Sequence, residues 1–343
     1  MPLLQRYRGV VCDLDGVVYR GPLAVVHAVE AIRAAQVPVL YATNNASRTP
    51  DEVAAHLRDL GLDHVGADAV VTSSQAGARH LARRHGTGVR VLAVGGPGVA
   101  EALAREGLAP VAPVEAAARP CVAVLQGYGA NVTAADLAEA AYAVQAGAEW
   151  VATNTDGTLP TDRGTAPGNG TLVAAVARAC GTDPLVVGKP HAPLYELCAE
   201  VAGLATGELL AVGDRLDTDI AGAVATGMDS ALVLTGVDGP ASLVLAPPAQ
   251  RPTYLLADLR GLHADYLPAV LAADGTWSCG GHARRLVDGR WEAPGRSTRE
   301  APGEAPEVEE LRCVVAALHE ALDRGTCSEA DALRLLSEAG VAQ

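Results

Sequence analysis

The stretch RGVVCDLDGVVYRG, residues 8–21, decides the fold class of this chain. Its first half, RGVVCDL (8–14), is a short valine-rich run that predicts a buried strand. Two carboxylates two positions apart, Asp13 and Asp15, follow on a chain that turns at Gly16, so both can face one cavity. One could attack phosphorus while the other moves protons, although a solvated loop is an equally good interpretation of this motif alone.

Further short apolar runs alternate with helical segments along the chain. They are VPVLYAT (37–43), PLVVGK (184–189), ELLAVGD (208–214) and SALVLTG (230–236). This alternation predicts an α/β protein with a Rossmann-like, doubly wound parallel sheet, in which ligands bind beyond the carboxyl ends of the strands. Thr43, Asn44, Lys189 and Asp214 stand at such ends. We therefore expect them in one crevice with the two carboxylates.

A second alternating block, residues 73–183, interrupts this series of polar residues. It is long enough to be a domain, and we expect an inserted α/β cap that closes over the crevice. The catalytic core would then consist of residues 1–72 plus 184–268.

The last segment, residues 269–343, differs from the rest in its sequence pattern and predicts a small α+β appendage. WSCGGHARRLVDGRWEA (277–293) indicates a hairpin that turns at Asp288-Gly289. A Pro/Gly/Glu-rich linker (294–306) separates the hairpin from two amphipathic helices, about 307–323 and 328–339, the second opened by Ser328.

The composition excludes several classes of protein. With 49% apolar and 19% charged residues, the 343-residue chain can bury a large core and should form more than one domain. Its net charge of −14 argues against nucleic acid and anionic membranes as partners. An anionic substrate would then need local neutralisation by a divalent cation, a lysine or helix N-termini.

Seven scattered cysteines show neither CxxC pairs nor Cys/His metal spacing, which indicates reduced thiols. The N-terminal apolar run is too short for a signal peptide, and no apolar stretch of about 18 residues occurs elsewhere. We therefore expect a cytoplasmic protein without membrane insertion.

GDRLDTDIAGA (213–223) supplies a second acidic cluster at a strand end. Carboxylates are the hard oxygen ligands that suit Mg²⁺. We expect Asp214 to be a metal ligand, whereas Asp217 is better explained as the N-cap of the following helix.

Two further strand ends offer groups for an anion. In TNN (43–45), Thr43, Asn44 and Asn45 could donate hydrogen bonds to phosphate oxygens, although an Asx turn explains the motif equally well. In GKP (188–190), Lys189 would be the fixed positive charge of the crevice, since few lysines stand at the end of a buried strand.

In this order, DLDGVVYRG, TNN, GKP and GDRLDTDI resemble the four motifs of the haloacid dehalogenase-type phosphatases, in the p-nitrophenyl phosphatase-like branch with an α/β (type IIA) cap. The resemblance spans residues 5–268. It extends to a cap pattern similar to TNTDGTLPT (153–161) and PGNG (167–170). It implies Mg²⁺-dependent hydrolysis of a small phosphate monoester, with Mn²⁺ or Co²⁺ as possible substitutes.

Carried over motif by motif, the resemblance implies that Asp13 is the nucleophile that forms an aspartyl-phosphate. Asp15 would be the general acid that protonates the leaving oxygen and then activates water. Mg²⁺ would be held by Asp13, the backbone carbonyl of Asp15 and Asp214, and Asp219 would orient the water molecules on the metal or Lys189. The residues implied to bind the phosphoryl group are Thr43, Asn44, Asn45 and Lys189.

The substrate must be inferred from the cap and the appendage. Leu159 stands where the similar pyridoxal phosphate phosphatases carry histidine, and QGYG (126–129) departs from the usual pattern of the branch. The segment after residue 268 resembles the C-terminal segment of actinobacterial glycerol 3-phosphate phosphatases, a partial acetyltransferase-like fold. We therefore favour glycerol 3-phosphate, with phosphoglycolate and pyridoxal phosphate as alternatives.

Two hypotheses from other classes remain. VLAVGGPGVAEAL (91–103) suggests a dinucleotide-binding turn, but Glu101 stands where its third glycine belongs, so a tight turn in the cap is the better interpretation. A non-catalytic protein that binds a phosphate ligand is the other, and the full set of catalytic residues argues against it. A homodimer is plausible from similar enzymes.

Overall fold

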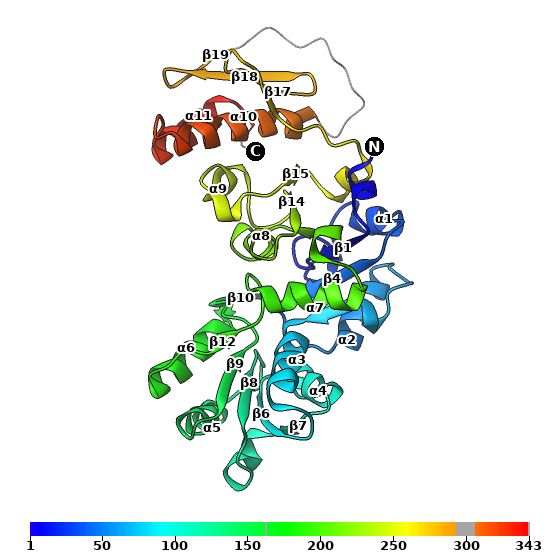
Figure 1. The fold of residues 1–343 in the computed structure, drawn as a ribbon, viewed down its shortest axis with the longest axis vertical. Helices are drawn as coiled ribbons and strands as arrows, with labels where there is room; N and C mark the ends of the chain where they lie inside the picture. The colour runs from blue at the N-terminus through cyan, green and yellow to red at the C-terminus, as the bar shows by residue number, and fades with distance from the viewer. Residues whose placement is uncertain (162, 293–305, 342–343) are drawn as a thin grey trace. The chain divides into compact units, whose positions relative to one another are not determined.

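The computed structural model describes residues 1–161, 163–292 and 306–341 (Figure 1). The chain divides into two compact units, one of Met1–Val39 with Leu204–Gln343 and one of Leu40–Gly203. The limits of core, cap and appendage given by the sequence stay a prediction.

The first unit contains a parallel sheet in the order β15-β14-β13-β1. These strands are β1 (Gly9–Cys12), β13 (Leu209–Gly213), β14 (Asp229–Val233) and β15 (Tyr254–Leu256). β1 and β13 are buried along their whole length. Because parallel strands end at the same edge, the loops after Cys12, Gly213 and Val233 emerge together. The expected α/β class with a parallel sheet is confirmed.

Short helices and turns precede, connect and follow the strands of this sheet. They are α1 (Ala28–Arg33), α8 (Ala221–Ala225), α9 (Pro240–Val244), the 3₁₀ turns η1 (Leu3–Arg6), η4 (Thr206–Glu208), η6 (Pro248–Gln250) and η7 (Leu259–His263), and the π-helical turn η5 (Leu216–Ile220). A small hairpin, β2 (Tyr19–Arg20) with β3 (Leu23–Ala24), follows β1. In the described part of the chain, no helix is long and apolar enough to span a membrane.

The C-terminal segment forms an antiparallel sheet and two helices. Its elements are β16 (Val270–Leu271), β17 (Trp277–Cys279), β18 (His282–Val287), β19 (Arg290–Glu292), α10 (Pro306–Asp323) and α11 (Glu329–Glu338). The predicted hairpin is confirmed, since Asp288 and Gly289 both have positive φ in a two-residue turn. Both helices are confirmed, and Ser328 caps α11. Of the predicted linker, residues 294–305 lie outside the described residues.

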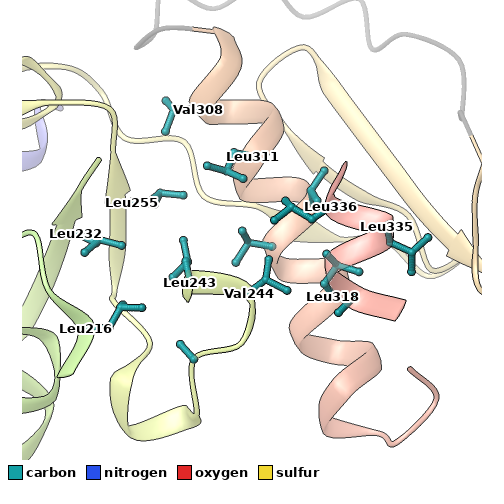
Figure 2. Packing of buried hydrophobic residues seen from close by; sticks show 14 of the residues in the cluster. Leu216, Leu232, Leu243, Val244, Leu255, Val308, Leu311, Leu318, Leu335 and Leu336 are labelled. Atoms are coloured by element: carbon teal, nitrogen blue, oxygen red, sulfur yellow. The ribbon is translucent and has the colours of Figure 1, made fainter. Parts of the chain in front are cut away.

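One hydrophobic cluster joins these helices to the parallel sheet (Figure 2). Leu216 and Leu243 enter it from the sheet side, and Leu318 and Leu335 enter it from α10 and α11. Polar contacts add to the packing. The Arg251 guanidinium donates to both carboxylate oxygens of Asp323 at 2.6 and 2.7 Å, and His319 Nε2 lies 2.8 Å from the Leu243 carbonyl oxygen. The helices therefore share a core with the sheet.

The second unit is built around a parallel sheet in the order β12-β9-β8-β6-β7. Its strands are β6 (Arg90–Val94), β7 (Ala109–Val111), β8 (Ala123–Gln126), β9 (Glu149–Ala152) and β12 (Leu185–Val186). The unit also holds the parallel pair β4 (Val39–Thr43) and β5 (Val70–Thr72), and the hairpin β10 (Thr158–Thr161) with β11 (Gly164–Pro167).

Helices cover both faces of this five-stranded sheet (Figure 1). They are α3 (Ser73–His85), α4 (Pro97–Arg105), α5 (Ala134–Gln145) and α6 (Asn169–Cys180), and the unit also contains α2 (Pro50–Asp59), α7 (Ala192–Ala202) and the 3₁₀ turns η2 (Ala67–Ala69) and η3 (Pro113–Ala118). Side chains alternate along β8: Val124 packs with α5 and α6, whereas Leu125 faces Gly77 of α3, where an added Cβ would lie 2.5 Å from it. Capping boxes at Thr49, Thr72 and Thr133 fix the starts of α2, α3 and α5.

The prediction that a buried strand ends directly at Lys189 is wrong. The strand covers only Leu185 and Val186, and it pairs with β9 at the edge of the five-stranded sheet. The side chain of Leu185 is 43% exposed. Pro184 before the strand and Pro190 after it limit the hydrogen-bonded ladder that this apolar run can form.

Candidate active site

Three carboxylates gather where β1 and β13 end in the first unit. Asp13, Asp214 and Asp219 each offer an oxygen, and these oxygens lie within 4.8 Å of one another. Asp214 and Asp219 are 0% and 3% exposed, and Asp13 is half-buried. Like charges this close and this buried repel each other strongly unless a cation or protons neutralise them.

The structure places Asp13 and Asp15 in different surroundings, although they are only two positions apart in the sequence. Asp13 continues β1, because its N–H donates to the Val212 carbonyl oxygen at 2.8 Å. The side chain of Asp15 is exposed in the following loop. Gly16 has φ +87°, and its N–H donates to the Tyr19 carbonyl oxygen at 2.8 Å. The loop therefore turns at Gly16, as the sequence indicates.

The loop after β14 holds the Asp214 carboxylate. Its Oδ2 accepts a hydrogen bond of 2.7 Å from the Val237 N–H. An added Cβ would lie 2.3 Å from the same oxygen at Gly16 and 1.8 Å from it at Gly236. Two glycines and one backbone N–H thus form a cradle that only the Asp214 carboxylate fills.

Asp219 reaches the cluster because of the π-helical turn η5. Its Oδ2 accepts from the Arg215 N–H at 3.1 Å, and its own N–H donates to the Arg215 carbonyl oxygen at 3.0 Å. The prediction that Asp217 caps the start of this turn is wrong. Its exposed carboxylate accepts from the Arg215 guanidinium at 3.0 and 3.1 Å. The wide turn brings the side chain of the residue four positions on from Arg215, not two, back to the Arg215 N–H.

Sequence reasoning missed Asp238. Its Oδ2 accepts from the Leu216 N–H at 2.6 Å, and its N–H donates to the Asp214 carbonyl oxygen at 3.0 Å. The only signal in the sequence is its position in TGVDG (235–239), directly after the strand SALVL, at the same sheet edge as Asp13 and Asp214.

In the second unit, Lys189 and Asn44 are fixed to each other. Lys189 is 5% exposed, and its Nζ donates to the Ala42 carbonyl oxygen at 3.1 Å, at the end of β4. Asn44 Oδ1 accepts from the Lys189 N–H at 2.8 Å, and its Nδ2 donates to the Lys189 carbonyl oxygen at 3.0 Å. Burial raises the pKa of Cys198 to about 12, although the charge of Lys189 acts in the opposite direction. That thiol therefore stays neutral beside the lysine.

The other two residues of TNN shape the loop after β4. Asn45 Oδ1 accepts from the Ser47 N–H at 3.0 Å and from the Ser47 hydroxyl at 2.6 Å. These bonds form the Asx turn that the sequence TNN favours as one of two explanations. Thr43 is 4% exposed, and its hydroxyl accepts from the Asn45 N–H at 3.0 Å. Thr43 and Lys189 thus both lie at the carboxyl end of β4.

The two cap motifs meet at Asn44. Asn154 Nδ2 donates to the Asn44 carbonyl oxygen at 2.7 Å, and Asn169 Nδ2 donates to the Asn154 carbonyl oxygen at 2.7 Å. Asp156 Oδ2 accepts from Asn44 Nδ2 at 3.3 Å. The stretches TNTDGTLPT and PGNG therefore build the surroundings of Asn44.

The glycines of VLAVGGPG are needed for close packing. An added Cβ at Gly98 would lie 2.4 Å from the Arg48 carbonyl oxygen, and one at Gly96 would lie 2.6 Å from that of Ser47. The predicted tight turn is confirmed by φ +146° at Gly95. None of the seven cysteines forms a disulfide, and all seven lie in the described ranges.

The acidic cluster fits a hard divalent cation. Its donors are carboxylate oxygens, which Mg²⁺ and Ca²⁺ prefer to nitrogen or sulfur. The glycine cradle holds one carboxylate in a fixed place, and a positive ion relieves the repulsion among the three.

Comparisons with known proteins agree with this chemistry. A family model described as haloacid dehalogenase-like hydrolase matches residues 10–109, and one described as HAD-hydrolase-like matches residues 186–262. A D-glycerol 3-phosphate phosphatase from Mycobacterium tuberculosis is 46% identical over 278 residues, which are 80% of this chain and 76% of that protein.

Two solved structures are similar to most of the chain. A glycerol phosphate phosphatase from Mycobacterium tuberculosis in complex with magnesium has a TM-score of 0.83 at 40% identity, covering 93% of this chain and 92% of its own. A p-nitrophenyl phosphatase from Archaeoglobus fulgidus has a TM-score of 0.68 at 27% identity, covering 75% of this chain and 98% of its own.

Proposed function

This chain belongs to the haloacid dehalogenase-like hydrolases and is a phosphatase, and we propose that it hydrolyses glycerol 3-phosphate to glycerol and inorganic phosphate. The observation that carries the chemistry is the cluster of Asp13, Asp214 and Asp219 at the carboxyl ends of β1 and β13. The two buried carboxylates can hold a cation next to the half-buried Asp13, an arrangement that suits phosphoryl transfer to Asp13.

We propose that the Asp13 carboxylate attacks phosphorus while the bond between phosphorus and the glycerol oxygen breaks. Asp15 would give its proton to that oxygen, and its exposed position in the turning loop lets it meet a leaving group. A water molecule would then attack the aspartyl-phosphate, with Asp15 taking its proton, which releases phosphate and restores Asp13.

Mg²⁺ would be held by Asp13, the backbone carbonyl of Asp15 and Asp214, with Asp219 close enough to bind it directly or through water. When bound, the ion would neutralise negative charge on the phosphoryl oxygens during transfer. Mn²⁺ or Co²⁺ would substitute for it, because both accept the same oxygen donors.

For the phosphoryl group we propose binding by Thr43 and Lys189, with Asn44 positioning Lys189 and Asn45 shaping the loop. Both hydrogens of the Asn44 side-chain amide already have partners, in Lys189 and Asp156. We therefore assign its side chain to holding the Lys189 backbone, which leaves the Lys189 ammonium to face the anion.

The substrate assignment rests on similarity and on the cap. The relative named D-glycerol 3-phosphate phosphatase shares 46% of the aligned residues. Leu159, on the hairpin β10–β11, has no polar group to bind a pyridine ring, which disfavours pyridoxal phosphate. Residues 73–183 would be the cap that selects the leaving group, and phosphoglycolate stays an alternative.

Phosphate release from a panel of esters tests this function. The panel holds glycerol 3-phosphate, phosphoglycolate, pyridoxal phosphate and p-nitrophenyl phosphate, each with and without Mg²⁺, Mn²⁺ and Co²⁺. We expect metal-dependent release with the highest kcat/KM for glycerol 3-phosphate. A higher kcat/KM for another ester would overturn the substrate, and release that is equal without metal would overturn the mechanism.

The nucleophile has its own test. Asp13→Asn keeps the shape of the side chain but replaces the nucleophilic carboxylate with a neutral amide, so we expect kcat to fall by several orders of magnitude on every ester. Asp217→Asn, an exposed carboxylate in the same acidic motif, is the control and should keep the wild-type kcat. Circular dichroism checks the fold of both variants. Unchanged turnover in Asp13→Asn would exclude the aspartyl-phosphate.

We propose a small phosphorylated metabolite as the partner of this protein in the cytoplasm. A homodimer stays a prediction from similar enzymes. Light scattering after size exclusion would test it, since a monomer mass at micromolar concentration contradicts it.

A further inference from the structure

Asp238 contacts both segments that carry the buried acids. It is half-buried in the loop after β14 and takes no part in the chemistry proposed above. Through its side chain it accepts from the Leu216 N–H at 2.6 Å, the first N–H of η5. Through its backbone it donates to the Asp214 carbonyl oxygen at 3.0 Å. The short side-chain bond to a carboxylate is of the stronger, charge-assisted kind.

Leu216 links the Asp238 contact to the hydrophobic core. It stands between Asp214 and Asp219, and its side chain is 4% exposed in the hydrophobic cluster of Figure 2. The Leu216 side chain therefore holds η5 against the core, while Asp238 holds the Leu216 N–H. The neighbouring Val237 N–H binds the Asp214 carboxylate itself at 2.7 Å.

We propose that Asp238 is a positioning residue of the metal centre, which sets the affinity for Mg²⁺ by holding Asp214 and η5 in one geometry. The proposal rests on the metal role given under the proposed function. Residues that orient metal ligands typically change metal affinity by about 10- to 100-fold when they are removed. The hydrogen bond, and not the negative charge, is the part of Asp238 that acts.

Three variants separate the hydrogen bond from the charge. Asp238→Ala removes both, whereas Asp238→Asn removes the charge and keeps an oxygen that can accept from Leu216. Asp217→Ala is the matched control. It removes one negative charge from η5, the turn that Asp238 contacts, but the hydrogen bonds it breaks there are those from the Arg215 side chain. The Asp238 side chain borders a cavity of about 270 Å³, so water can replace it in Asp238→Ala and the variant should fold.

The readout is Mg²⁺ binding by isothermal titration calorimetry, without substrate. We expect the Kd of Asp238→Ala to rise about tenfold or more, and that of Asp238→Asn and Asp217→Ala to stay within about threefold of wild type. Equal Kd values for Asp238→Ala and wild type would overturn the proposal. So would an equal loss in Asp238→Asn, because charge would then be the cause.

The same titration separates this inference from the proposed function. If the wild-type protein binds Mg²⁺ but Asp238→Ala binds it equally well, only the role of Asp238 fails. If the wild-type protein binds no Mg²⁺, the metal centre itself is wrong, and the inference falls with it.

Discussion

Single atoms decide the geometry of the acidic cluster, and Gly236 is the clearest case. Its Cα faces the Asp214 carboxylate so closely that a Cβ would lie 1.8 Å from Oδ2 and 2.3 Å from both Cβ and Cγ of Asp214. No rotamer change of a methyl group can relieve such an overlap. Either the carboxylate or the loop must move.

We therefore expect Gly236→Ala to displace Asp214 and to raise the Mg²⁺ concentration for half-maximal activity by about 10- to 100-fold. Gly239→Ala, three residues further in the same loop, is the control, because an added Cβ there meets nothing within 4 Å. Phosphate release measured over a Mg²⁺ series checks both. Equal curves for the two variants would show that the loop absorbs the methyl group without moving the carboxylate.

The sequence predicts single site residues where a pattern marks them. Asp13 and Asp214 each follow a valine- or leucine-rich run, so a strand end and an acid coincide, and the structure brings their oxygens together. Asp238 has no such mark, because an acid in TGVDG is typical of any turn. The bonds from Asn44 to Lys189 join residues far apart in the chain, and no local pattern can indicate them.

Among the elements, α3 and β9 of the second unit are joined by one carboxylate. Glu149 on β9 accepts from His80 Nε2 at 3.0 Å and from His85 Nε2 at 2.7 Å, and Arg84 Nε lies 2.8 Å from it. Partial burial alone raises the pKa of Glu149, but the bonds from both histidines and the charge of Arg84 outweigh it and lower the pKa.

A carboxyl group whose pKa is lowered in the folded state stabilises that state above its unfolded pKa, and this stabilisation is lost as the pH falls through the folded pKa. We therefore expect Glu149→Gln to lower the free energy of unfolding at pH 7. The difference in this free energy between variant and wild type should shrink as the pH falls below 4.5, the ordinary pKa of a glutamate. Urea denaturation from pH 7 to pH 3.5 measures it. A difference that is constant over this range would contradict the assigned cause.

In this sequence, local signals mark where helices start more clearly than how long strands are. α2, α3 and α5 begin at threonines whose side chains and third residues form capping boxes, and these signals are local. The apolar run PLVVGK predicts a strand along its whole length, yet only Leu185 and Val186 pair with a neighbouring strand. Its length depends on an available neighbour, which is a property of the assembled sheet and not of the run.

At the scale of the whole molecule, the first unit is made from both ends of the chain. The Leu3 N–H donates to the Ala264 carbonyl oxygen at 2.9 Å, and the N-terminal ammonium lies 2.8 Å from Asp265. At the other end, α10 and α11 bury leucines in the cluster that also holds Leu216 of η5 (Figure 2). The C-terminal helices are thus part of the core that supports η5 and, with it, the proposed metal centre.

Removing a buried leucine from α11 should therefore destabilise the parallel sheet as well as the helix. Leu335 is fully buried, and we expect Leu335→Ala to lower the free energy of unfolding by about 2–5 kcal/mol. Leu333→Ala on the same helix, 37% exposed, should change it by less than about 0.5 kcal/mol. Urea denaturation followed by circular dichroism gives both values. A loss in Leu335→Ala no larger than in Leu333→Ala would show that α11 adds nothing to this core.

The order of these elements along the chain has a consequence for synthesis on the ribosome. The second unit is one continuous segment, Leu40–Gly203, and all of it is available before the residues of β13 are translated. Asp13 is translated well before Asp214 and Asp219, and the leucines of α11 are translated after all three. The three carboxylates therefore come together only after β13 and η5 have been made. A polypeptide cut short by a premature stop codon before Asp214 carries Asp13, the proposed nucleophile, without the two carboxylates that gather beside it.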